Sequence, residues 1–133
     1  MARIHQRLEL AARTLTRLEE TLAIEQPTLV ERDAAIQRFE FTFEAVWKAA
    51  KDYLFTLEGV DVASPKGVIR HCREVGILTD EEAQTALLMA DDRNLTVHTY
   101  NEPLAVAIHS RLPAYRAILA NWLARMQERV LKL

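Results

Sequence analysis

Apolar residues recur at steps of three and four along most of this chain. In the first segment the apolar positions are Ile4, Leu8, Ala11, Leu15, Leu18 and Leu22. This spacing places the side chains on one face of an α-helix, which turns once every ~3.6 residues. The pattern therefore predicts an amphipathic helix that starts near Ile4 and stops before Pro27.

A second, longer apolar pattern follows Pro27. It predicts a helix from about Leu29 to Leu57 that ends at Gly59, because glycine readily adopts the left-handed conformation that closes helices. The inward positions of this helix are Ile36, Phe39, Phe43, Val46, Trp47, Ala50 and Leu54. Phe41 and Phe55 widen the apolar surface beyond one stripe, which predicts that the helix is central or touches a second subunit.

Two further helices are indicated by their capping residues. Ser64-Pro65 is a helix-start signal, with serine as the N-cap and proline in the first turn. The short helix that follows is predicted to close at Gly76. Thr79 and Glu82 then have the spacing of a capping box, which opens a fourth helix that is predicted to run to Arg93 and a little beyond.

The last apolar pattern begins near Pro103 and continues to the C-terminus. Its positions are Leu104, Ile108, Leu112, Tyr115, Leu119, Trp122, Met126 and Val130. Pro113 lies inside it and is expected to kink the helix or split it in two. No alternating strand pattern, internal repeat or linker interrupts the chain. Residues 1–133 therefore predict a single all-α domain, an antiparallel up-and-down bundle of about five helices joined by short loops.

Composition agrees with one soluble globular domain. The chain has 133 residues, of which 50% are hydrophobic and 27% charged, enough apolar material for a single core. The formal net charge of -2 creates no overall attraction for nucleic acid, so RNA contact requires a local group of arginines. The N-terminus lacks the apolar core of a signal peptide, and no stretch approaches the ~20 apolar residues that span a bilayer. We expect a cytoplasmic protein without membrane contact.

Several kinds of site are excluded by what the sequence lacks. Cys72 is the only cysteine, so one chain forms no disulfide and no cysteine-type zinc site. No glycine-rich phosphate loop occurs, and no helix carries the Glu-x-x-His motif that a di-iron bundle needs twice. Glu40 and Glu44 share a face of the second helix, and we expect one of them to reach the surface or to bind an arginine across the bundle. Neither a cofactor nor a metal is expected.

The other histidines and the two tryptophans fit structural roles. Solvated or capping positions are predicted for His5, His71 and His109. Trp47 and Trp122 match the apolar stripes and are predicted to lie in the core.

The segment from Asp92 to Tyr100 (DRNLTVHTY) concentrates the chemistry of the chain. Arg93 can bind phosphate through a fixed fork of donors, and His98 can move protons near neutrality. On a continuous helix the two would lie about 7.5 Å apart along the axis and about 140° apart around it. They can meet one phosphate if the helix unwinds near Val97, or if a two-fold axis brings two copies together. From spacing alone, ordinary helix-capping chemistry is an equal alternative.

Three segments stand out by their order and spacing. They are Phe39–Lys51 (FEFTFEAVWKAAK), Ser64–Arg70 (SPKGVIR) and Asp92–Tyr100. Together they resemble the nucleotidyltransferase substrate-binding protein family, a branch of the HEPN superfamily of small helical bundles. The resemblance extends from about Phe39 to the last helix, and it implies a HEPN-like fold.

The resemblance also implies an activity and partners. Many HEPN proteins are metal-independent ribonucleases whose motif is an arginine, four to six residues, and a histidine, which Arg93 and His98 match. Members of this branch are typically encoded beside a minimal nucleotidyltransferase and form dimers. In toxin–antitoxin members a tyrosine follows two places after the histidine, as Tyr100 does here. There the nucleotidyltransferase acts as the antitoxin and attaches adenylate to that tyrosine.

The implied reaction suits these residues. RNA supplies its own nucleophile, the 2′-hydroxyl, so cleavage needs proton transfer and charge stabilisation. In a homodimer, His98 of each chain would supply the acid and the base, and Arg93 of each would hold the phosphate. Asn94 would orient the histidine or contact RNA, with Asp92 in support. The alternative is a non-catalytic subunit that presents a substrate to a nucleotidyltransferase, with the same fold and dimer.

Overall fold

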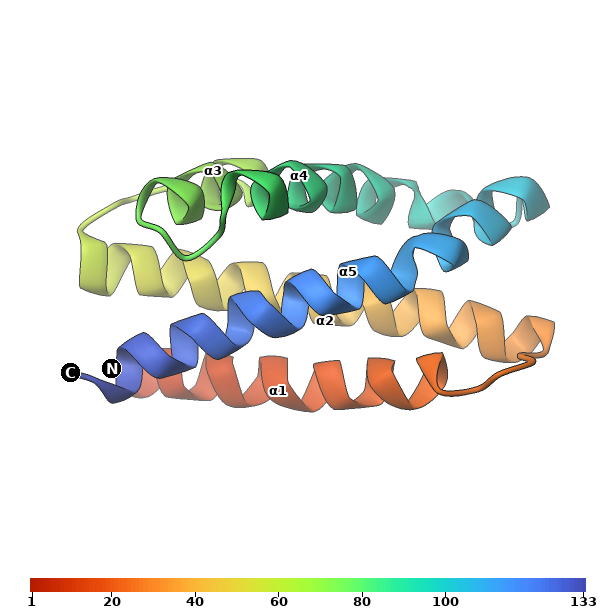
Figure 1. Ribbon diagram of the computed structural model, residues 1–133, viewed down its shortest axis with the longest axis horizontal. Helices are drawn as coiled ribbons and strands as arrows, with labels where there is room; N and C mark the ends of the chain where they lie inside the picture. The colour runs from red at the N-terminus through yellow and green to blue at the C-terminus, as the bar shows by residue number, and fades with distance from the viewer.

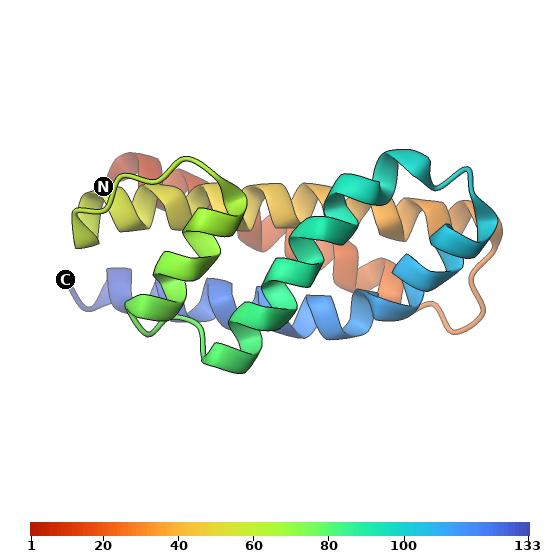
Figure 2. The same ribbon diagram turned by 90° about the horizontal axis from the view of Figure 1, so that it is seen from above.

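The computed structural model describes residues 1–133 and is entirely helical. Its elements are α1 (Ala2–Leu22), α2 (Leu29–Glu58), α3 (Pro65–Glu74), α4 (Asp80–Leu95), the 3₁₀ turn η1 (Thr96–His98) and α5 (Glu102–Leu131). Figure 1 shows α1, α2 and α5 as three long rods, with α3 and α4 covering one side. Figure 2 shows these two shorter helices lying obliquely across the long ones. The predicted bundle of five helices is confirmed.

The helix ends follow the predicted capping residues. Thr79 and Glu82 form both hydrogen bonds of a capping box, and Ser64 Oγ accepts from the Gly67 amide at 3.1 Å. Gly59 closes α2 with φ at 67°, in the left-handed region. α2 also begins with a capping box, formed by Thr28 and Glu31, which was not predicted from the sequence.

The predicted apolar stripes form one continuous core. All seven residues predicted to face inward on α2 are buried. Trp122 of α5 is completely buried. Phe41 and Phe55 are 54% and 63% exposed, so α2 does carry apolar surface outside the core of one chain. That this surface touches a second subunit stays a prediction.

Pro113 bends the last helix but does not split it. Of the two effects expected from the sequence, the kink is confirmed and the split into two helices is wrong. α5 is helical on both sides of the proline, and Figure 2 shows its first turns running at an angle to the rest. Proline removes one backbone donor and clashes with the preceding turn, which bends a helix without requiring a break. Leu112 and Tyr115 are buried on either side of the exposed proline, so core packing holds the two parts of the helix together.

Ion pairs fasten the ends of the helices to one another. The buried guanidinium of Arg32, near the start of α2, binds the carboxylate of Glu102 at the start of α5. Arg125 of α5 donates to the Ile77 carbonyl at 2.9 Å and to Glu82 at 2.5 Å, which ties the α3–α4 loop to α5. These contacts fix the two ends of α5 against the rest of the bundle.

None of the helices combines the length and the apolar character that crossing a membrane requires.

Candidate functional site

The helix that carries Arg93 ends before it reaches His98. α4 stops at Leu95, and the chain continues as the 3₁₀ turn η1 from Thr96 to His98. The Thr96 hydroxyl donates to the Arg93 carbonyl at 2.7 Å, which satisfies one of the acceptors freed at the helix end. The α-helix therefore ends between Arg93 and His98, and the chain tightens into a 3₁₀ turn there.

His98 and Tyr100 form an exposed pair beyond that helix end. The His98 Nδ1 atom lies 3.3 Å from the Tyr100 hydroxyl, and the rings meet edge to face with centroids 5.8 Å apart. Tyr100 is 84% exposed, so its side chain lies outside the core. An imidazole in contact with solvent can exchange protons freely.

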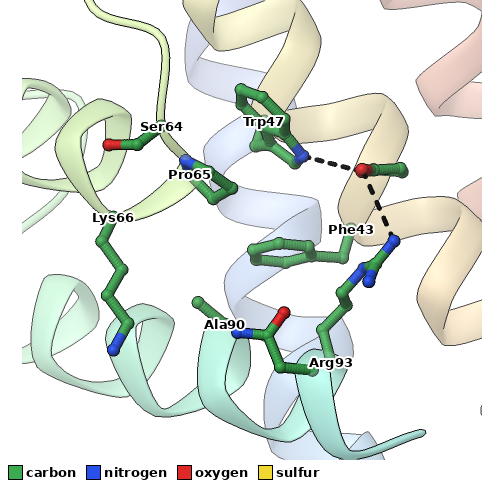
Figure 3. Close-up of a pocket in the computed structure, with 9 residues that line it drawn as sticks. Phe43, Trp47, Ser64, Pro65, Lys66, Ala90 and Arg93 are labelled. Atoms are coloured by element: carbon green, nitrogen blue, oxygen red, sulfur yellow. Dashed lines mark hydrogen bonds and ion pairs between the residues drawn. The ribbon is translucent and has the colours of Figure 1, made fainter. Parts of the chain in front are cut away.

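Arg93 points in another direction, towards α2. Its Nη2 atom lies 3.6 Å from Glu44 Oε1, and Glu44 also accepts a 2.9 Å hydrogen bond from the Trp47 indole. Figure 3 marks both interactions with dashed lines, one from Trp47 and one from Arg93. The expectation that a glutamate of α2 binds an arginine across the bundle is confirmed for Glu44. The Arg93 Nε atom is buried and has no hydrogen-bond partner.

A hollow of about 450 Å³ opens beside Arg93, between α2, α4 and the start of α3. Its lining residues are Phe43, Glu44, Trp47, Ser64, Pro65, Lys66, Ala90, Arg93 and Asn94. Arg93 and Asn94 thus share this hollow, whereas His98 and Tyr100 are not among its lining residues. The structure of one chain forms two groups, the hollow with Arg93 and Asn94 and the exposed pair of His98 and Tyr100.

Asp92, predicted as a supporting residue, faces the bundle interior instead of the hollow. It is 6% exposed and accepts a 2.6 Å hydrogen bond from the Tyr115 hydroxyl and one of 3.3 Å from Arg111. Burial and, after it, the contact with Asp92 raise the pKa of the Tyr115 hydroxyl well above its usual range. Asp92 therefore fixes α4 against α5 next to Arg93.

Two features of this hollow were not predicted from the sequence, the presence of Lys66 and the role of Trp47. Trp47 is buried, as predicted, yet it also forms part of the wall. Lys66 lies in the first turn of α3 and pairs with Asp91 at 2.6 Å. The segment that contains Lys66 was identified by its helix-start signal and by the family resemblance, but helix periodicity says nothing about which lysine faces a cavity.

The remaining titratable residues form no second site. His71 pairs with Glu74 at 3.1 Å, and burial followed by the charge of Arg32 lowers the pKa of His109. Burial raises the pKa of the Cys72 thiol to about 12. No three or more histidine, cysteine, aspartate or glutamate side chains are grouped so that they could hold a metal ion.

Comparisons with known proteins agree with this fold. Residues 6–128 match the family described as "Nucleotidyltransferase substrate binding protein like". A crystal structure from Thermus thermophilus is 60% identical, with a TM-score of 0.85 over 87% of this chain and 98% of that one. A Haemophilus influenzae structure, described as the fold of a substrate binding domain of a nucleotidyltransferase, has a TM-score of 0.76 over 90% of this chain and 98% of that one, at 23% identity.

Two curated relatives have different names. A probable ribonuclease HepT from Haemophilus influenzae is 27% identical over 111 residues, which cover 80% of this chain and 73% of that protein. The bifunctional purine biosynthesis protein PurH of Rhizobium rhizogenes is 32% identical over 89 residues, which cover 63% of this chain. This match spans only 16% of PurH.

Proposed function

The chain belongs to the nucleotidyltransferase substrate binding protein like family, and we propose that it is a metal-independent ribonuclease toxin held in check by a partner nucleotidyltransferase. The observation that carries the proposal is the end of α4 between Arg93 and His98. It frees an exposed imidazole from the helix that holds the arginine. The likeness to a probable ribonuclease supports the same activity.

The reaction needs three things of the protein. A base takes the proton of the RNA 2′-hydroxyl, an acid protonates the leaving 5′-oxygen, and a cation stabilises the phosphate as charge builds. Histidine can serve as either acid or base near pH 7, so His98 of one chain and His98 of a second chain would divide these roles. Arg93 would hold the non-bridging phosphate oxygens, since its guanidinium stays charged throughout.

A homodimer would complete this site. Five large apolar side chains of α4, the η1 segment and the start of α5 are exposed, namely Leu88, Leu95, Val97, Tyr100 and Val106. A second chain that packs against this part of the molecule would bury apolar area that one chain leaves in water. A two-fold axis through this region would place two histidines and two arginines in one cleft, although each chain supplies only one of each.

Control of the enzyme would act at Tyr100. The partner nucleotidyltransferase would transfer adenylate from ATP to the exposed phenol, forming a bond between the phenolic oxygen and the α-phosphorus and releasing pyrophosphate. The new phosphodiester would carry a negative charge beside His98, whose ring lies 3.3 Å from the Tyr100 hydroxyl. The negative charge and the size of the adenylate would then keep RNA away from His98.

The second candidate function is a non-catalytic subunit that presents a substrate to the nucleotidyltransferase. The hollow between α2, α3 and α4 favours it, because a cavity of about 450 Å³ with apolar walls and several polar groups is the usual form of a small-molecule site. The family description, which names substrate binding, also supports this alternative.

Expression in cells separates the two functions. Induction of the unmodified chain alone should stop growth, and co-expression with the nucleotidyltransferase encoded beside it should restore growth. The His98→Ala variant should be harmless in both settings, and His71→Ala should remain toxic. Normal growth on induction of the unmodified, well-expressed chain would favour the substrate-binding subunit.

A further inference from the structure

The hollow beside Arg93 includes a segment that the arginine, histidine and tyrosine motif does not explain. Ser64, Pro65 and Lys66 line it from the first turn of α3. This turn is tightly built, because a Cβ atom on Gly67 would lie 2.6 Å from Val62 Cγ2 and 2.7 Å from Ser64 Oγ. A larger residue at position 67 would force the side chain of Val62 or Ser64 to shift, so the turn that carries Lys66 is closely packed.

Arg93 has donors that the protein leaves unsatisfied. Its Nε atom is buried without a partner, and its contact with Glu44, at 3.6 Å, is an ion pair longer than a hydrogen bond. Buried donors without acceptors are rare in folded proteins because they lose their hydration and gain nothing in return. An oxyanion entering the hollow would give the guanidinium of Arg93 a closer acceptor than Glu44, and guanidinium groups bind phosphate through paired donors.

The other lining residues could also bind the part of a ligand that is attached to the phosphate. Phe43, Trp47, Pro65 and Ala90 give the hollow an apolar wall, as Figure 3 shows. Asn94 adds an amide that both donates and accepts hydrogen bonds. This combination of cationic groups, an amide and an apolar wall fits a flat heterocycle that is linked to a phosphate.

We propose that this hollow is the subsite for one nucleotide of the RNA, adjoining the phosphate that is cleaved. The base lies against the apolar wall, and Arg93 and Lys66 hold the phosphate from two sides. Lys66 is free to do so because its pair with Asp91 joins two side chains that are 42% and 54% exposed, and such pairs exchange readily. That the nucleotide belongs to RNA rests on the proposed ribonuclease function.

Calorimetric titration of the unmodified chain with adenosine 5′-monophosphate tests the subsite. Binding should be at least about tenfold tighter than that of ribose 5-phosphate, since base stacking and burial add to the phosphate contact. Lys66→Gln should weaken binding about fivefold or more, and Lys48→Gln, which alters a half-buried lysine of α2 outside the hollow, should leave it unchanged. Tryptophan fluorescence should change on binding, because Trp47 lines the hollow. The change can be assigned to Trp47, since the other tryptophan, Trp122, is completely buried.

The outcomes separate this subsite from the nuclease itself. His71→Ala, which alters a histidine outside the hollow, should bind the nucleotide as the unmodified chain does. Equal affinity for ribose 5-phosphate and the nucleotide would overturn the base subsite, and so would unchanged binding in Lys66→Gln. If RNA is cleaved but no mononucleotide binds at millimolar concentration, only the subsite fails. If the nucleotide binds but RNA is not cleaved, only the ribonuclease proposal fails.

Discussion

The hydroxyl of Tyr115 on α5 donates a 2.6 Å hydrogen bond to the carboxylate of Asp92 on α4, one residue before Arg93. Asp92 is 6% exposed, and its other hydrogen-bonding partner is Arg111 at 3.3 Å. A buried carboxylate is stable only when its oxygens are satisfied. This bond therefore both stabilises the fold and fixes the helix turn from which Arg93 reaches the hollow.

Tyr115→Phe should lower the stability of the protein. The variant removes the stronger partner of a buried carboxylate and keeps the ring, so we expect a loss of about 1–3 kcal/mol in the free energy of unfolding. Thermal unfolding should show a decrease of about 4–11 °C in Tm. Tyr100→Phe makes the same change at an exposed site and should unfold within about 0.5 kcal/mol of the unmodified chain. Equal stability of the two variants would contradict the role assigned to Asp92.

Acid should weaken the attachment of α4 to α5 at Glu82. Partial burial acts to raise the pKa of Glu82, but the hydrogen bonds from Arg125 and from the Thr79 backbone outweigh it and lower the pKa from 4.5 to about 2. The ionised carboxylate therefore stabilises the fold above pH 4.5, and this contribution is lost as the pH falls from 4.5 towards 2. At pH 7 it amounts to about 3 kcal/mol at most.

Denaturant unfolding of Glu82→Gln measures this contribution directly. The variant should be less stable than the unmodified chain at pH 7, and the difference should shrink by roughly half or more at about pH 2.5. Glu81→Gln changes an exposed glutamate in the same turn and should follow the unmodified chain at both values. A difference for Glu82→Gln that is independent of pH would show that its ionisation is not responsible.

The proposed dimer should depend on the apolar surface around η1. Light scattering on the unmodified chain should give about twice its mass of 15.2 kDa. Val97→Asp places a charge at a side chain that is 68% exposed, so the fold should persist while the dimer weakens about tenfold or more. Leu131→Asp, at an 85% exposed site at the other end of α5, should remain dimeric. A strict monomer at high micromolar concentration would undo the composite site.

Tyr100 should be the position that the partner nucleotidyltransferase modifies. After co-expression with that enzyme, intact-mass analysis should show increments of the size of adenylate, because the phenol is 84% exposed. The increments should vanish in Tyr100→Phe, while a Tyr53→Phe control alters a buried ring and should keep them. Neutralised toxicity with no change of mass would indicate control by binding alone.

The fold could be predicted because its signals are local. Thr79 and Glu82 cap a helix through atoms three residues apart, and Gly59 ends one through its own backbone freedom. Only part of the site could be predicted in this way. Arg93 and His98 became candidates through their spacing and the family resemblance.

The rest of the site depends on contacts between distant parts of the chain. Lys66 reaches the hollow because α3 lies across α2 and beside α4, and Asp92 turns inward because Tyr115 lies opposite it on α5. Neither relationship has a sequence periodicity. The same holds for Pro113, since core packing on both sides of it decides that the helix bends without breaking.

The most direct test of the account is RNA cleavage by the purified, unmodified chain in the presence of EDTA. Cleavage should proceed and should leave fragments with a 2′,3′-cyclic phosphate, because the 2′-hydroxyl is the nucleophile and the protein supplies the acid, the base and the cation. Arg93→Ala and His98→Ala should each lower the rate at least about a hundredfold, and His71→Ala should leave it unchanged. Full activity in His98→Ala, or loss of the unmodified chain's activity on adding EDTA, would contradict the mechanism.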